Sequence, residues 1–485
     1  MKRVLSRYAS LSIQAKAALW FVICNILQKG ISTISVPVFT RLMSTEQYGV
    51  YQVFLSWQSL IAVFTSLNLY LGVFNNAMIK FCNDRNKYIS SMQGLTALIT
   101  AMAFIGYLLF KDFFNEFLNM STLLVCLLFL DLLFIPAMLF WAGRQRFEYK
   151  YKILVGVTLL KAAFNPLLGV VAVVLNDEKD IARIITIVLI EVIFGGAIAL
   201  YQMFRGKKLF VKEYWKYALA FNIPLLPHYL SGMMLNQADR IMISKMLGNT
   251  QVALYSVAYS IGMLMQLFTD AINSSFTPWM YTSLKNKKYT EIKTIVNILL
   301  FLIAIFAIIL MFFAPEVITI FASDEYVEAI YVIPPVASSV YFIFAYNVFA
   351  NIEFYYEEKS FVAIASLAAA VLNVILNYIF IPIFGYYAAG YTTLLCYIIF
   401  SVSHYAFSCI VCDKHINGER IYDLRMFMLI SLLVVATALG FNFLYKFTLV
   451  RYSLAVFLLL CIYIKRSLVI DTIKKIRNNM RETGP

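Results

Sequence analysis

Apolar runs of about 20 residues follow one another along almost the whole chain, and only short polar or charged connections separate them. A helix of that length crosses a lipid bilayer. Of the 485 residues, 62% are hydrophobic and only 14% are charged, which leaves no room for a sizeable aqueous domain. The sequence therefore predicts an all-α polytopic membrane protein and excludes a soluble globular one.

Fourteen transmembrane spans are predicted from the apolar runs and from the charged, Pro or Gly residues that bound them. The predicted spans are residues 17–40, 47–74, 92–110, 121–142, 152–175, 181–204, 217–247, 250–280, 294–313, 328–351, 361–382, 387–411, 424–444 and 450–464. The basic start of the chain, with Lys2, Arg3 and Arg7, is similar to a secretion signal. No small-residue cleavage site follows it, so we interpret the first span as a retained helix.

The Lys and Arg residues alternate between the connections. Of the 40 cations, 30 fall in one alternate set of connections and the two ends, 8 fall in the other set or at the helix ends beside it, and Lys29 and Lys161 lie inside spans. Connections on the cytoplasmic side of a membrane carry the excess of Lys and Arg. The pattern predicts an even number of crossings with both termini in the cytoplasm, so the net charge of +14 reflects topology and indicates no nucleic-acid partner.

A short internal repeat predicts how the spans are grouped. At an offset of 204 residues, segment 40–43 matches segment 244–247, and Gln47, Tyr51 and Val53 match Gln251, Tyr255 and Val257. The two segments join spans one and two and spans seven and eight, so the halves have the same orientation. The predicted domains are a six-helix lobe at 1–204, a basic cytoplasmic linker at 205–216, a second six-helix lobe at 217–411, two additional helices at 412–464 and a basic cytoplasmic tail at 465–485, taken as a helix on anionic lipid.

Polar residues inside the spans are the candidate functional residues, because a charged residue at bilayer depth is costly in lipid. Asn25 and Lys29 share one face of span one, Lys161 lies in span five, and His228, Asn236, Asp239 and Arg240 lie in span seven. At 1.5 Å per residue, Lys161, Lys29 and Arg240 fall at the cytoplasmic, middle and outer levels of the membrane. Such a ladder of cations suits an anionic head group, since Lys and Arg bind phosphate.

The alternative interpretation is that these cations are neutralised within the fold. Asp131, Glu191, Asp239 and Asp270 also lie inside predicted spans, so Lys161 could pair with Asp131, and Arg240 with Asp239. The same four carboxylates are the candidates for coupling to a proton or a cation. The cations can therefore bind substrate or form ion pairs within the protein. The carboxylates can take part in coupling or form the same ion pairs, and the sequence leaves both choices open.

Signatures of enzymes and metal sites are weak. His228, His404 and His415 form no hydrolytic arrangement, and Cys409 and Cys412 with His415 fall short of four metal ligands. The chain contains no G-x-x-x-x-G-K-[ST] loop for nucleotide phosphates. We therefore expect no enzymatic activity, metal or cofactor beyond a possible dependence on H⁺ or Na⁺.

Two segments resemble those of a known family. Residues 34–51 (ISVPVFTRLMSTEQYGVY) and residues 222–259 are similar to the signature regions of bacterial polysaccharide flippases, the Wzx-type branch of the multidrug/oligosaccharidyl-lipid/polysaccharide (MOP) superfamily. The resemblance extends over the fourteen-span layout. It implies two six-helix lobes that open alternately to each side of the bacterial cytoplasmic membrane around a cationic cavity.

The resemblance also implies a cargo, an oligosaccharide repeat unit linked by diphosphate to a polyprenyl lipid, with membrane lipids and other polysaccharide assembly proteins as partners. Basic residues of the first and seventh family helices correspond to Lys29 and Arg240 here. Two other functions compete with flipping. A cation-coupled multidrug exporter of the same superfamily would need a cavity dominated by carboxylates, and a membrane glycan polymerase or ligase would need a larger outer loop than residues 314–327.

Overall fold

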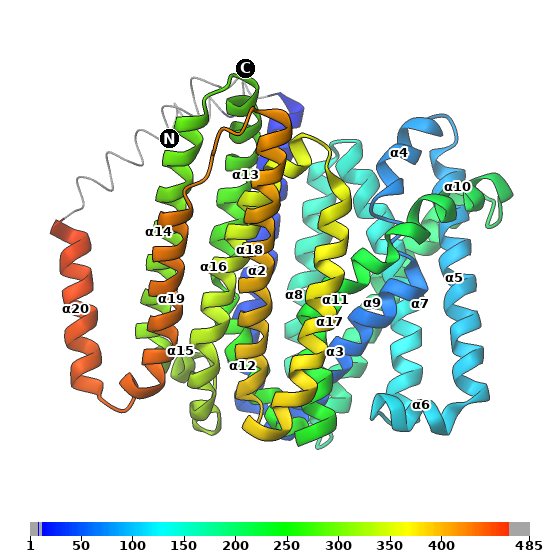
Figure 1. The fold of residues 1–485 in the computed structure, drawn as a ribbon. Helices are drawn as coiled ribbons and strands as arrows, with labels where there is room; N and C mark the ends of the chain where they lie inside the picture. Colours follow the sequence, from blue (N-terminus) through cyan, green and yellow to red (C-terminus); the bar gives the residue numbers. More distant parts are fainter. Residues whose placement is uncertain (1–7, 9–11, 465–485) are drawn as a thin grey trace. The chain divides into compact units, whose positions relative to one another are not determined.

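The computed structural model describes residue 8 and residues 12–464, and every regular element in this part of the chain is a helix (Figure 1). The predicted all-α membrane fold is confirmed. The chain divides into two compact units, residues 1–253 and residues 254–485. The predicted basic tail, 465–485, lies outside the described residues.

The first unit contains most of the polar residues singled out above. Its elements are α2 (Ile13–Leu42), α3 (Thr45–Ser66), α4 (Val73–Lys80), α5 (Arg85–Leu109), α6 (Lys111–Leu118), α7 (Thr122–Phe147), α8 (Tyr151–Leu175), α9 (Lys179–Gly206), α10 (Lys212–Asn222), the 3₁₀ helix η1 (Ile223–Leu225), α11 (Leu226–Leu247) and the start of α12 (Asn249–Gly262). The short helices α4 and α10 lie at one end of this unit and α6 lies at the other (Figure 1). This placement agrees with the alternation of charge along the chain.

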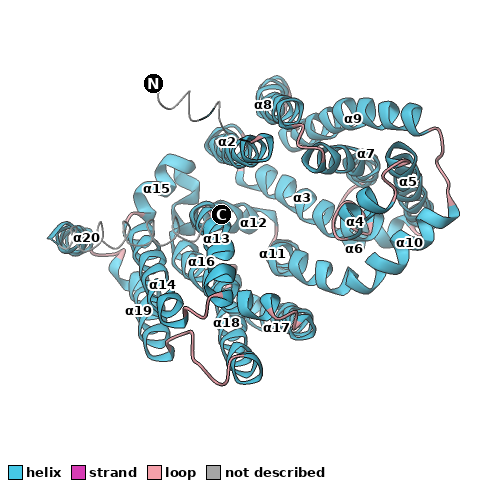
Figure 2. Cartoon of the chain, turned by 90° about the horizontal axis from the view of Figure 1, so that it is seen from above, coloured by secondary structure: helices cyan, strands magenta, loops and turns pink. Residues whose placement is uncertain are grey.

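The second unit is built around α16. Its elements after α12 are α13 (Met265–Lys285), α14 (Tyr289–Phe312), α15 (Ala314–Phe321), the 3₁₀ helix η2 (Asp324–Val332), α16 (Ile333–Tyr355), α17 (Lys359–Phe384), α18 (Tyr387–His415), α19 (Leu424–Leu444) and α20 (Thr448–Ile464). Helix α16 packs against α13, α14, α18 and α19, and most of its residues are buried (Figure 2). The apolar surface of α16 is therefore covered mainly by other helices of the unit.

Each predicted span coincides with one or more helices of the structure. Among the described residues, eleven helical segments are long and apolar enough to cross a membrane. Helices α3 and α11 coincide with predicted spans but fall outside this group, as does α20, which has only 17 residues. The six-helix lobes and the linker remain predictions, because the compact units divide inside α12 and not at residues 205–216.

Three predicted spans are interrupted or shorter than expected. Helix α3 ends at Ser66 because Leu67 and Asn68 adopt left-handed backbone conformations, and the side chain of Asn222 donates hydrogen bonds to both of their carbonyl oxygens, at 2.9 and 2.8 Å. Predicted span 217–247 is split into α10, η1 and α11. Predicted span 250–280 is split into α12 and α13. Apolar runs show where the chain is buried, but they do not reveal such breaks.

The repeated segments have the same local form, a helix end followed by a short break and a new helix. Ser44 caps α3 in a reciprocal arrangement with Gln47, and Gln47 and Gln251 both occupy the third position of their helices. The two segments also touch within the first unit. A Cβ atom built on Gly49 would lie 1.9 Å from the backbone oxygen of Asn249, so only glycine fits there.

We therefore expect Gly49→Ala to force α3 and the start of α12 apart. Overpacking of this kind costs about 1–3 kcal/mol, which should appear as a lower midpoint for thermal unfolding of the purified protein in detergent. Gly156→Ala in α8 is the matched control, because no atom lies within 4 Å of its added Cβ. Equal unfolding midpoints for Gly49→Ala and the wild type would contradict the close contact.

Candidate functional site

A cluster of charged side chains lies inside the first unit, where α3, α7, α8 and α9 meet. The ammonium of Lys161 donates a hydrogen bond to Glu191 Oε2, and the amide of Gln58 donates one to Asp131 Oδ2. Asp131 and Glu191 are buried, and the side chain of Lys161 is 22% exposed. Two predicted coupling carboxylates and one predicted substrate-binding cation therefore belong to one cluster.

Close packing of α9 on α7 brings the two carboxylates together. Gly195 lies one turn after Glu191, and a Cβ atom on it would be 2.8 Å from the backbone oxygen of Phe134. Phe134 in turn lies three residues beyond Asp131, so this approach places Glu191 beside Asp131. The glycine at position 195 thus lets the helices come near enough for both acids to interact with Lys161.

The cluster contains more acid than base. One ammonium faces two carboxyl groups, and Asp131 Oδ1 and Glu191 Oε1 are buried without a hydrogen-bond partner among the described residues. An unneutralised carboxylate in a low-dielectric interior is costly. The arrangement therefore favours uptake of one proton or one small cation.

Lys161 forms an ion pair within the protein, which is one of the two alternatives that the sequence left open. Its partner differs from the one that the sequence analysis suggested. The hydrogen-bonded ion pair is with Glu191 on α9, not with Asp131 on α7. The reason is helix packing. Lys161 lies on α8, and α8 makes a more extensive contact with α9 than with α7. A direct role for Lys161 in substrate binding remains a prediction.

Lys29 and Asn25 lie on α2, a long helix with little cover. The buried residues of α2 are only four, Ala17, Cys24, Phe39 and Thr40. Both Lys29 and Asn25 are exposed, near the middle of the helix. A lysine at this depth needs a hydrated or anionic neighbour, since lipid chains cannot solvate it.

Arg240 lies at the interface of α11 with α3 and is only 7% exposed. Its guanidinium donates hydrogen bonds to the backbone oxygen of Asn236 (2.8 Å) and to Gln237 Oε1 (3.4 Å). Ser56 of α3 donates to the same Gln237 oxygen at 3.1 Å. Asn236 uses its amide to reach the backbone oxygen of Gly232 at 2.8 Å. The bond from Ser56 links α3 to α11, and the other bonds lie within α11.

The remaining predicted site residues are distributed elsewhere. Asp239 is fully buried in α11. His228 is exposed near the start of α11, with its ring 6.0 Å from that of Tyr229. Asp270 is an exposed residue of α13 and belongs to the second unit. Roles for these residues in substrate binding or coupling remain predictions.

Further buried ionisable residues, Arg183 and the pair of His404 and Glu353 among them, were not among the predicted site residues. Arg183 of α9 is 4% exposed, donates to the side-chain oxygen of Asn165 at 2.6 Å and lies over the ring of Phe39 at 4.2 Å. In the second unit, His404 Nδ1 lies 2.9 Å from Glu353 Oε1, and both side chains are fully buried. An ionisable residue inside an apolar run is the signal that could have revealed both.

Family comparisons connect this chain to polysaccharide synthesis. A family model described as "Polysaccharide biosynthesis protein" matches residues 15–282, and a model named MatE matches residues 224–379. A protein of the Lsg locus of Haemophilus influenzae is 21% identical over 369 residues, which cover 74% of this chain and 89% of that protein.

Solved structures share the fold at low sequence identity. The lipid II flippase MurJ, in an inward closed conformation, matches with a TM-score of 0.68 and 14% identity over 94% of this chain and 100% of its own. An inward-facing multidrug transporter of the MATE family gives a TM-score of 0.60 with 14% identity over 82% of this chain and 96% of its own. A MOP superfamily transporter from Pyrococcus furiosus, described as having a binding pocket of reverse polarity, gives 0.58 with 13% identity over 83% and 96%.

The buried pair of the second unit generates a stability prediction. His404→Leu removes the partner of the Glu353 carboxyl group inside the protein, and we expect the free energy of unfolding to fall by about 3–5 kcal/mol. The double variant Glu353→Leu/His404→Leu removes both polar groups and should recover most of that loss. Denaturant unfolding of the wild type, the single variants His404→Leu and Glu353→Leu, and the double variant in detergent gives the coupling energy. Strictly additive losses would show that the pair contributes nothing.

Proposed function

From the premise that this chain belongs to the polysaccharide biosynthesis protein family of the MOP superfamily, we propose that it is a flippase for lipid-linked oligosaccharides. Its cargo is a polyprenyl-diphosphate-linked repeat unit that moves from the inner to the outer leaflet of the bacterial cytoplasmic membrane. Both termini lie in the cytoplasm, as the distribution of Lys and Arg favours. The mechanism is alternating access around basic residues.

The position of Lys29 is the observation on which this proposal rests. This lysine has an exposed ammonium near the middle of a membrane-length helix. A diphosphate and its sugars cannot cross about 30 Å of hydrocarbon without a polar path, whereas the polyprenyl tail is soluble in lipid. A cation at mid-depth supplies the charge that the diphosphate loses when it leaves water.

The Asp131–Lys161–Glu191 cluster is the proposed coupling site. Its surplus carboxylate can take up H⁺ or Na⁺ from one side of the membrane and release it on the other. Uptake and release change the charge balance among α7, α8 and α9, the helices that hold the cluster. A gradient is a suitable energy source because the sequence has no Walker-type phosphate-binding loop.

Cation-coupled multidrug export is the competing function, and the MatE match to residues 224–379 favours it. An organic cation would be repelled by an exposed lysine in its path and attracted by carboxylates. The sign of the charge preferred at position 29 therefore distinguishes the two functions.

We expect Lys29→Glu to abolish leaflet exchange of a polyprenyl-diphosphate oligosaccharide in reconstituted vesicles. Loss of a charged hydrogen bond costs about 1.5–3 kcal/mol, and the carboxylate adds repulsion, so the rate should fall by at least about tenfold. Lys29→Arg keeps the positive charge and should retain part of the activity. Lys16→Glu makes the same charge change in the same helix nearer its end and is the matched control.

Normal exchange by Lys29→Glu would remove Lys29 from the proposed site. Exchange of organic cations by the wild type, with no exchange of the lipid-linked oligosaccharide, would favour the multidrug function instead.

Asp131→Asn removes the surplus carboxylate and leaves the Lys161–Glu191 pair intact. We expect this variant to lose the acceleration that an imposed H⁺ or Na⁺ gradient gives to the wild type, while exchange without a gradient continues. Glu46→Gln neutralises an exposed carboxylate in the first turn of α3 and is the matched control. Equal stimulation of Asp131→Asn and the wild type by both gradients would exclude the cluster as the coupling site.

A further inference from the structure

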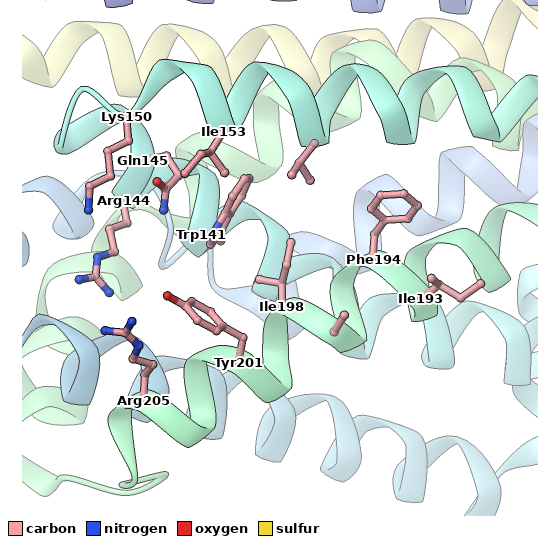
Figure 3. Close-up of a pocket in the computed structure, with 12 residues that line it drawn as sticks. Trp141, Arg144, Gln145, Lys150, Ile153, Ile193, Phe194, Ile198, Tyr201 and Arg205 are labelled. Atoms are coloured by element: carbon pink, nitrogen blue, oxygen red, sulfur yellow. The ribbon is translucent and has the colours of Figure 1, made fainter. Parts of the chain in front are cut away.

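A hollow of about 650 Å³ lies between α8 and α9 of the first unit, with the end of α7 beneath it. Figure 3 shows that Arg144, Lys150 and Arg205 gather at one end of the hollow, while Ile193 and Phe194 lie toward the other. The hollow is therefore polar and cationic at one end and apolar along the rest of its length.

The cationic end carries more positive charge than the protein neutralises. Glu148 accepts hydrogen bonds from Arg144 Nε at 2.9 Å and from Lys150 Nζ at 2.5 Å, and Arg85 Nη1 lies 3.9 Å from its Oε1, so one carboxylate faces three cations. Arg205 lies over the ring of Tyr201 at 5.5 Å and has no carboxylate within ion-pair distance in the described part of the chain. Burial alone would raise the pKa of Glu148. Hydrogen bonds and charge from Lys150 and Arg144 lower the pKa by more than burial raises it, so the pKa is below the ordinary value and the carboxyl group stays ionised.

The apolar part of the hollow is open to the surroundings of the protein. Ile153 of α8 is 60% exposed and Ile193 of α9 is 54% exposed, and both line the hollow on membrane-spanning helices. Acyl chains are the surroundings of such side chains in a bilayer. A ligand with an anionic head and a hydrocarbon tail matches both parts at once.

We propose that this hollow binds an anionic phospholipid of the adjacent leaflet. The phosphate lies between Arg144, Lys150 and Arg205, and the first part of an acyl chain follows the apolar wall of α8 and α9. The polar end lies on the side that the charge distribution assigns to the cytoplasm, where basic pockets between helices meet anionic lipid.

A phospholipid fits better than the oligosaccharide-bearing cargo. Apart from the three cations, the polar groups that line the hollow are the amide of Gln145, the hydroxyl of Tyr201 and the indole N–H of Trp141. Three cations with three neutral groups are enough for one phosphate. Several sugar rings would need many more donors and acceptors. This inference does not depend on the proposed flippase activity, because it concerns lipid that stays bound to one unit.

Native mass spectrometry of the full-length protein in detergent tests the proposal with three probes, phosphatidylglycerol, phosphatidylethanolamine and a polyprenyl phosphate. The wild type should retain phosphatidylglycerol in preference to the other two. The double variant Lys150→Gln/Arg205→Gln should bind it about tenfold or more weakly, because two charge-assisted contacts are lost. Lys208→Gln/Lys212→Gln makes the same change in net charge at exposed positions outside the hollow and should bind as the wild type does.

A second pair of variants tests the apolar part with every charge in place. Ala197→Trp fills the hollow from the exposed side of α9 and should displace the lipid, whereas Leu200→Trp, on an exposed position outside the hollow, should not. Equal retention of phosphatidylglycerol by Lys150→Gln/Arg205→Gln and its control would overturn the proposal. Equal retention of phosphatidylethanolamine, or preferential retention of polyprenyl phosphate, would also overturn it.

Discussion

A charged side chain at bilayer depth is stable only beside a countercharge, a hydrogen-bonding group or water. This requirement determines which helices of each unit are neighbours. Lys161 and Glu191 join α8 to α9, and Gln58 and Asp131 join α3 to α7. In the second unit the pair of His404 and Glu353 joins α18 to α16. The first contact connects consecutive helices, and the other two connect helices that are not consecutive in the chain.

The same requirement is met in different ways by different cations of the first unit. The positive charge of Lys161 is satisfied by Glu191, and that of Arg183 by Asn165 and an aromatic ring. Lys29 is exposed on a helix with few buried residues. Lys29 and Lys161 are the same type of residue but differ in predicted depth and in their surroundings, so residue type alone does not determine their chemistry.

Sequence analysis predicted the all-α membrane fold and the order and approximate positions of the long helices, because the length of an apolar run depends on the thickness of the bilayer. It did not predict the breaks at Leu67 and Asn68, which depend on hydrogen bonds from Asn222 more than 150 residues away. The partner of Lys161 could not be predicted either, since Asp131 and Glu191 lie at similar depths and only packing of α8 on α9 selects between them. The types of residue present in the membrane thus indicate which charged and polar groups a site can contain. The tertiary structure determines which of these groups form ion pairs and hydrogen bonds.

Helices α3 and α11 show why that tertiary information matters for insertion. Neither is as apolar as the other long helices, so each would be costly as a lone helix in lipid. Where α3 packs against α11, Ser56 and Arg240 both donate hydrogen bonds to Gln237 Oε1. Polar groups that would oppose insertion of either helix alone are satisfied in the pair. The two helices therefore stabilise each other in the membrane. The polar side chains of α3 and α11 are compatible with a stable fold because the helices associate.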